Sequence, residues 1–217
     1  MSPPPRAKHL WRYTPWPRIK PQEGVPVADK ILFSLDGDIA LQSGAPRAVL
    51  ESDIARVFLS EIGGSSHTLH IDGDFGLVHI QAKASGHVAA GHLHIECKGS
   101  ATVILHLTGE ADWSGLYVSG GVADNCKLAY GFINELSNDC KFLHCEDWVV
   151  GRDSVMEIAA LSVGDLGLYC KPYKPLLFDS QLLQNIPYVN STDAPLWHDC
   201  GPIWSTIEAQ LAPLKDT

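Results

Sequence analysis

Two histidines at alternate positions, His92 and His94, are the side chains of this sequence best suited to chemistry. On a β-strand, alternate side chains leave the same face, so both imidazoles can reach one metal ion. Glu96 follows two residues later and adds a carboxylate to that face. His92, His94 and Glu96 therefore form a candidate metal site, and the ordinary alternative is the solvated outer face of a strand.

The spacing of Gly86, His92 and His94 resembles the first half of the cupin metal motif. In that motif an acidic ligand follows a few residues later, where this chain has Lys98 and Gly99. A second half, with a Pro-Gly step and a distant histidine, does not follow either. A metal-dependent enzyme of cupin type is therefore an alternative function rather than the leading one.

A second group of metal-binding side chains consists of Cys140, His144 and Cys145. Thiolate and imidazole groups bind zinc or iron–sulfur species. In a strand, however, Cys140 and Cys145 face opposite ways, which favours a buried, apolar role for Cys140. Cys145 is the better candidate for an accessible thiol. On chemistry alone, the candidate cluster ligands are His144, Cys145 and Cys170.

The motifs of several common enzyme classes are missing from the sequence. It contains no G-x-x-x-x-G-K-S/T phosphate loop, no G-x-G-x-x-G after a strand and no G-x-S-x-G elbow. The adjacent carboxylates of Glu146 and Asp147 would lie on opposite faces of a strand, which suits acid–base catalysis poorly. We expect a protein that is not an enzyme.

The bulk composition indicates one globular domain. Of the 217 residues, 45% are hydrophobic and 19% are charged. The net charge of −9 argues against nucleic-acid binding. No apolar run reaches the roughly 20 residues that cross a bilayer, and the N-terminus lacks the apolar region of a signal peptide. The six cysteines therefore favour free thiols over disulfides, in a cytoplasmic protein that binds no membrane.

The elements that would position these residues are strands. Three blocks that begin with a polar turn residue, Asn125–Leu128, Asp139–Phe142 and Asp153–Met156, recur at intervals of 14 residues. A strand and its turn occupy roughly 8–14 residues, so the repeat predicts successive walls of an all-β solenoid or sandwich.

The same repeat predicts which side chains point inward. Leu128, Phe142 and Met156 share one inner position, whereas the lysines at 127 and 141 mark the outer face. By this parity Tyr130 and His144 point inward, and Leu143 and Cys145 point outward.

Three regions follow from composition: a proline- and aromatic-rich N-terminal arm (1–27), a β core (28–170) and a loop-rich tail (171–217). Asp36-Gly37 predicts a hairpin between the apolar runs at 31–33 and 39–41. Residues 48–59 have mixed helix and strand character. Within the tail, the apolar positions 203, 204, 207 and 211 predict a short amphipathic helix that begins after Pro202.

Several short segments, in the right order, resemble the SufB/SufD family. They are Trp11–Thr14 (WRYT), Ile31–Gly37 (ILFSLDG), Gly99–His106 (GSATVILH), Asn125–Leu128 (NCKL), Gly151–Ser154 (GRDS) and Leu161–Leu166 (LSVGDL). Together they cover roughly residues 10–168.

The resemblance implies a right-handed parallel β-helix that serves as a scaffold in iron–sulfur cluster assembly. Family members pair with one another and bind an ABC-type ATPase, SufC, through a C-terminal helical region. The resemblance thus implies a SufD-like chain that works with a SufB-like scaffold in a homo- or hetero-oligomer. The chain would hold no firmly bound cofactor but would handle a transient iron–sulfur cluster. A β-helix interaction protein that has lost assembly activity is the other alternative.

The chain departs from the family pattern near its C-terminus. Leu168 and Cys170 stand where the family has Arg and then Asn or Asp, and fewer turns and helices can follow. We therefore expect a shortened SufD-like protein, in which the family's cluster-related C-terminal segment has no clear counterpart.

Overall fold

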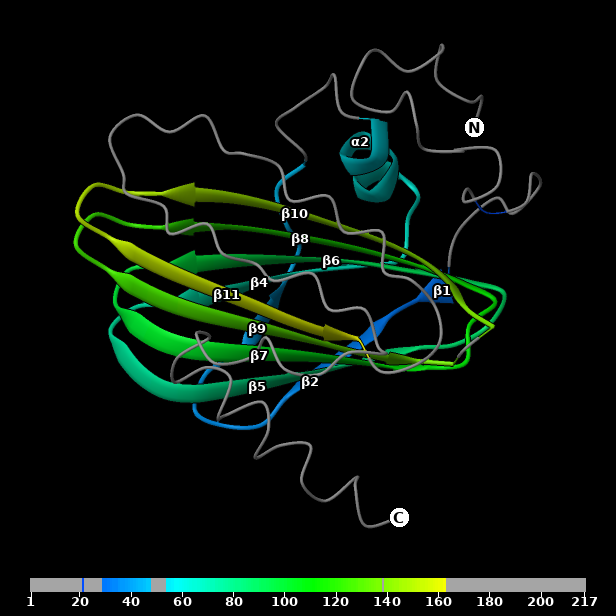
Figure 1. The fold of residues 1–217 in the computed structure, drawn as a ribbon, viewed down its shortest axis with the longest axis horizontal. Helices are drawn as coiled ribbons and strands as arrows, with labels where there is room; N and C mark the ends of the chain where they lie inside the picture. The colour runs from blue at the N-terminus through cyan, green and yellow to red at the C-terminus, as the bar shows by residue number, and fades with distance from the viewer. Residues whose placement is uncertain (1–20, 22–28, 48–53, 138, 163–217) are drawn as a thin grey trace, which may run out of the picture.

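The structure, a computed structural model, describes residues 21, 29–47, 54–137 and 139–162. These residues form one helix and eleven strands (Figure 1). The elements are β1 (Asp29–Lys30), β2 (Leu32–Leu35), β3 (Leu41–Ser43), α2 (Ile54–Glu61), β4 (Ser65–Ile71), β5 (Asp74–Ala84), β6 (Val88–Cys97), β7 (Ser100–Gly109), β8 (Trp113–Val122), β9 (Lys127–Leu136), β10 (Lys141–Val150) and β11 (Val155–Ser162). The predicted N-terminal arm (Pro21 apart), Cys170 and the tail with its expected helix lie outside this part of the chain.

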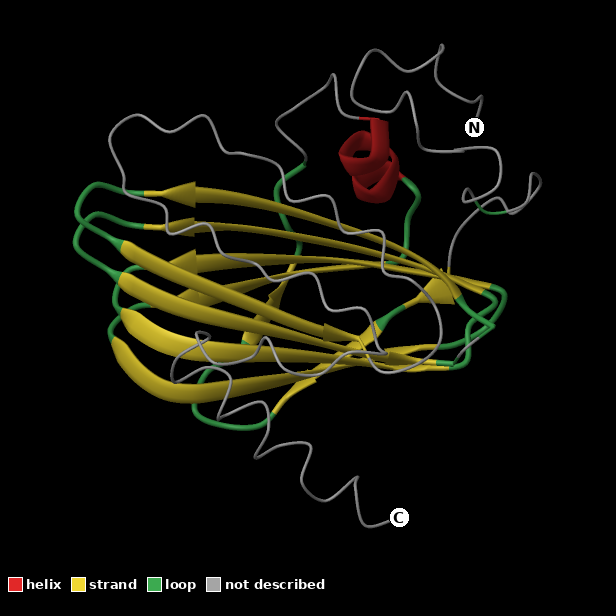
Figure 2. Cartoon of the chain, in the orientation of Figure 1, coloured by secondary structure: helices red, strands yellow, loops and turns green. Residues whose placement is uncertain are grey.

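From β4 to β11, successive strands alternate between two sheets that face each other (Figure 2). The helix-side sheet has the order β10-β8-β6-β4-β3, with β1 beside β6, and the opposite sheet has the order β11-β9-β7-β5-β2. Within each sheet, strands β4 to β11 pair in parallel with the strand two positions along the chain. The all-β parallel β-helix predicted above is therefore confirmed.

The 14-residue repeat corresponds to half a turn of the β-helix. Lys127, Lys141 and Val155 begin β9, β10 and β11, and Lys127 pairs with Val155, 28 residues later. Asn125 and Asp153, the polar residues before β9 and β11, adopt the positive φ angles of 59° and 55°. Asparagine and aspartate tolerate this left-handed conformation better than most other non-glycine residues, which explains why they stand at the same corner of two successive turns.

The space between the sheets is filled by one apolar core. Leu128 is fully buried there, and Phe142 and Met156 pack against the same core, while Lys127 and Lys141 are exposed on the outside. The predicted inward and outward faces of the repeat are therefore correct.

The chain before β4 differs from the predicted hairpin. β2 pairs antiparallel with β5 in one sheet, whereas β3 pairs antiparallel with β4 in the other. The Asp36-Gly37 turn therefore leads the chain between sheets rather than back along the same one. β2 and β3 each pair with the edge strand of a different parallel sheet, and this long-range pairing outweighs the local turn signal.

Helix α2 lies against the outer face of the helix-side sheet (Figure 1). Its Leu59 packs with Trp113, Tyr117 and Leu143, which project outward from β8 and β10. The mixed signal at 48–59 thus resolves into a helix that begins at Ile54 in the described part. No helix in that part is long and apolar enough to cross a membrane.

Candidate functional site

The outer face of the helix-side sheet gathers polar side chains next to α2. In β6, Leu93 and Ile95 enter the core, so His92, His94 and Glu96 project outward, as the alternation predicts. The outward row is less solvated than a plain strand surface, because His92 is only 6% exposed and the His94 side chain 15%. We call these three side chains the β6 polar row.

Ser119, in the neighbouring strand β8, joins the two histidines. Its Oγ lies 2.9 Å from Nε2 of His92 and 2.7 Å from Nδ1 of His94. A hydroxyl group has a single hydrogen, so it donates to one imidazole and accepts from the other. The positions of the protons on His92 and His94 are therefore coupled through Ser119.

Glu96 extends the network to His70 of β4. One carboxylate oxygen lies 3.1 Å from Nδ1 of His70, and the other lies 3.6 Å from Nε2 of His94. His70 and Glu96 are lateral neighbours in the parallel ladder. Their side chains are 32% and 41% exposed, so this end of the network is open to solvent.

Burial keeps both row histidines neutral near pH 7. Burial and the nearby His94 lower the pKa of His92 to about 4. The pKa of His94 is lowered chiefly by burial, against the opposing attraction of Glu96. Neutral imidazole has a free lone pair, which is the form that binds a metal ion or accepts a proton.

The other side of the row is closed by Tyr117 and Arg56. The Tyr117 ring packs on His92 with centroids 4.3 Å apart, and burial raises the pKa of its hydroxyl. Arg56 of α2 donates to the backbone oxygen of Glu146 at 2.8 Å and lies 3.7 Å from the Asp147 carboxylate. These contacts fasten the helix to the sheet beside the histidines.

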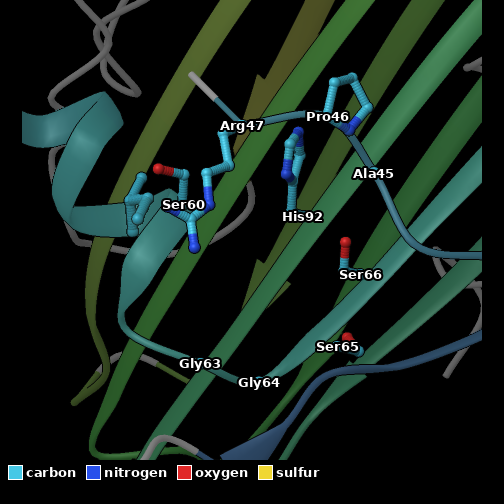
Figure 3. Close-up of a pocket in the computed structure, with 10 residues that line it drawn as sticks. Ala45, Pro46, Arg47, Ser60, Gly63, Gly64, Ser65, Ser66 and His92 are labelled. Carbon is cyan, nitrogen blue, oxygen red and sulfur yellow. The ribbon is translucent and has the colours of Figure 1, made fainter. Parts of the chain in front are cut away.

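A half-open hollow of about 200 Å³ lies between α2, the loop after β3 and the start of β4. Figure 3 shows the His92 ring standing on its floor, with Arg47 and Ser60 on one side and Ser66 on another. His92 therefore links the hollow to the Ser119 network. Among the described residues that line the hollow, Arg47 is the only one with a charged side chain.

The structure separates the predicted cluster ligands His144 and Cys145. His144 points into the core, where its ring lies 4.3 Å from that of Phe132. Cys145 points outward and packs beside Tyr117 and Leu143. Adjacent residues on opposite faces of β10 cannot bind one cluster, and Cys170 lies outside the described residues. Among the described residues, Cys97, Cys126 and Cys140 are free thiols.

Metal binding by His92, His94 and Glu96 together also meets an obstacle. His92 and His94 turn toward Ser119, whereas Glu96 lies near His94 and His70. In the described part of the chain no three His, Cys, Asp or Glu side chains form a ready metal centre. The parallel sheet also differs from a cupin barrel, which is an antiparallel jelly roll.

Sequence reasoning missed His70 and Ser119. Both come from neighbouring turns of the β-helix, 26 residues before Glu96 and 25 residues after His94. Residues one turn apart share a face. The sequence repeat gives a turn of 28 residues, however, whereas the turns here are 25 and 26 residues long, so the repeat does not point to His70 or Ser119. No protein-family model, curated protein or solved structure matches this chain.

Proposed function

We propose that this chain is a SufB/SufD-like scaffold component of an iron–sulfur cluster assembly complex, working in the cytosol with a SufC-type ATPase. One observation carries the proposal: three of the resembling segments occupy corresponding places in a parallel β-helix. Asn125–Leu128 and Gly151–Ser154 lie at the same corner of two successive turns, before β9 and β11, and Gly99–His106 covers the start and most of β7. This is the arrangement that the family resemblance implies for its repeating segments.

The proposal assigns the chain a structural role rather than a catalytic one. In this scheme the ATPase supplies the energy of hydrolysis, and the iron–sulfur cluster is cargo that the complex builds and passes on. His144 and Cys145 lie on opposite faces of β10, so we assign neither as a joint ligand of the cargo. The chain works as a rigid support for partner proteins.

The last described turn of the β-helix supports a partnership. β10 and β11 end their sheets, and among the described residues nothing pairs with their outer edges. Val150, Met156 and Ile158 of this turn are only partly buried against the core. Unpaired strand edges and half-covered apolar side chains favour association with a further strand or subunit. A SufB-like scaffold or a second copy would meet this need.

The proposal predicts a stable complex with the SufC-type ATPase of the same organism. The full chain and a variant that ends at residue 170 would be co-expressed with that ATPase and purified without oxygen. We expect the full chain to co-elute with the ATPase in size-exclusion chromatography, and the shortened variant to elute alone, because the resemblance places docking in the C-terminal region.

The control is the ATPase with its other scaffold protein. If that pair forms and the full chain still elutes alone, the assembly function is wrong and the chain is an interaction protein outside this pathway. Co-elution of the shortened variant would instead move docking onto the β-helix. Circular dichroism would establish that the shortened variant keeps its strands.

A further inference from the structure

Three side chains on two adjacent strands make the strongest unassigned cluster of the described chain: His70 of β4, and His94 and Glu96 of β6. The carboxylate of Glu96 lies between the two imidazoles, 3.1 Å from Nδ1 of His70 and 3.6 Å from Nε2 of His94. His70 is lateral to Glu96 in the ladder and diagonal to His94. All three leave the same face of a rigid sheet.

Two imidazoles and a carboxylate are a ligand set for zinc and related divalent transition metals. Sites with catalytic or exchangeable zinc commonly use three protein ligands and leave one position for water. Here the open position would face solvent, because His70 and Glu96 are about one third and two fifths exposed. The residue types support a metal site. His92 does not belong to its ligand set, because its Nε2 already contacts Ser119.

His94 is already oriented as a metal ligand. Ser119 holds its Nδ1 at 2.7 Å, so Nε2 is the nitrogen that turns toward Glu96. Ligating histidines characteristically make such a second hydrogen bond, which fixes both ring orientation and tautomer. His92 holds Ser119 from the other side at 2.9 Å and therefore acts as a positioning residue.

In the structure these side chains bond to one another rather than surround a common point, and no ready metal centre exists among the described residues. The side chains of His70 and Glu96 are partly exposed, so their ends have room to rotate toward a shared ion. Neither rotation disturbs the core, since the core side chains of both strands point the other way. A bound metal would take the place of the contacts between the carboxylate and the two imidazoles.

A second histidine pair is less suited to this role. His79 and His106 of the opposite sheet stack with centroids 6.2 Å apart and 17° between their planes. Stacked rings turn their faces, rather than their nitrogens, toward each other. Glu135 contacts His106, at 2.8 Å, so that cluster consists of two pairwise contacts.

We propose that His70, His94 and Glu96 bind one divalent transition-metal ion of the zinc class, with Ser119 and His92 orienting His94. The inference is independent of the scaffold function. The proposed site differs from the one expected from the sequence in one ligand: His70, from the preceding turn, takes the place of His92.

Isothermal titration of the full chain with zinc chloride at pH 7, in a buffer that does not chelate metals, tests the site. We expect one zinc ion for each chain whose binding requires His70 and Glu96. The variants His70→Asn and Glu96→Gln should each weaken this binding by at least about tenfold, the loss that even outer-shell changes cause. Magnesium chloride should give no binding, because magnesium prefers oxygen ligands in octahedral geometry.

His87→Asn is the matched control, because it removes an exposed histidine that pairs with Asp112 at 2.6 Å, away from the β6 polar row. It should bind zinc as the wild type does. The site is refuted if zinc does not bind, if both His70→Asn and Glu96→Gln bind it as the wild type does, or if magnesium binds equally well. Far-UV circular dichroism checks folding, and if only one of the two variants folds, its zinc binding decides the result.

Discussion

At the residue scale, the last described turns of the β-helix contain a buried titratable pair that the proposed function does not use. His144 and Glu146 both point from β10 into the interior of the β-helix, and Nε2 of His144 lies 3.5 Å from Oε1 of Glu146. Burial lowers the pKa of His144 to about 3 and raises that of Glu146 to about 7. Trp148 donates to the other Glu146 oxygen at 3.0 Å. The interior therefore favours an uncharged pair.

This pair predicts a pH-dependent stability difference for Glu146→Gln. Between about pH 4.5 and 7 the folded carboxyl keeps its proton while the unfolded one loses it, so wild-type stability falls as pH rises. Glutamine lacks this titration, and the contribution of His144 is present in both proteins. The variant should gain on the wild type by up to about 3 kcal/mol across this range.

Urea unfolding of both proteins at several pH values measures this gain. The difference in unfolding free energy should rise up to about pH 7 and stay constant above it. A difference that is constant from pH 4.5 to 8, with folded variants throughout, would show that water solvates Glu146 fully. The 23% exposure of its side chain makes the predicted gain an upper bound.

At the scale of elements, the sequence was enough to predict strands and faces but not partners. The inward Leu128 and outward Lys127 follow from alternation within one strand, which is a local property. His70 and Ser119 reach His94 only through the register between turns. That register varies, from 25 residues between His94 and Ser119 to 28 between Lys127 and Val155. A fixed repeat therefore could not have aligned them.

The strand faces also explain why the candidate cluster ligands His144 and Cys145 do not share one site. The spacing of His144 and Cys145 showed two metal-binding side chains close together, but their opposite parity already implied opposite faces, and the structure bears out that parity. Chemistry-based selection of residues thus needs the strand face as a second criterion.

Close packing between turns predicts opposite outcomes for two adjacent glycines of β8. A methyl group on Gly120 would collide with the Trp148 ring and lie 2.7 Å from the backbone oxygen of Ile95, whereas at Gly121 nothing lies within 4 Å. Gly120→Ala should therefore lower the unfolding free energy by about 1–3 kcal/mol. Gly121→Ala should leave it unchanged or raise it by up to about 1 kcal/mol.

Thermal and urea unfolding of the two glycine variants check this contrast. Equal stabilities would mean that the Trp148 ring moves aside at no cost, so that the interior near the last turn is not tightly packed. The neighbouring position serves as the control, because both changes add the same methyl group to the same strand.

At the scale of the whole molecule, the β-helix works as a stack of similar turns whose ends must be covered. Its first described turn is bordered by the antiparallel strands β2 and β3, whereas β10 and β11 have no strand beyond them in the described part. Each turn contacts only its neighbours, so an added strand or subunit at the last turn extends the core directly. The proposed scaffold function would use this edge to bind a partner.

The most direct test of the scaffold function is the iron and acid-labile sulfide bound by the assembled complex. The SufB-like partner and the SufC-type ATPase would be loaded anaerobically with iron, sulfide and ATP, with and without this chain. The proposed function predicts that cluster content or its rate of formation depends on the chain. Equal content and equal rates in both preparations, with the chain shown to be folded, would contradict the role in cluster assembly.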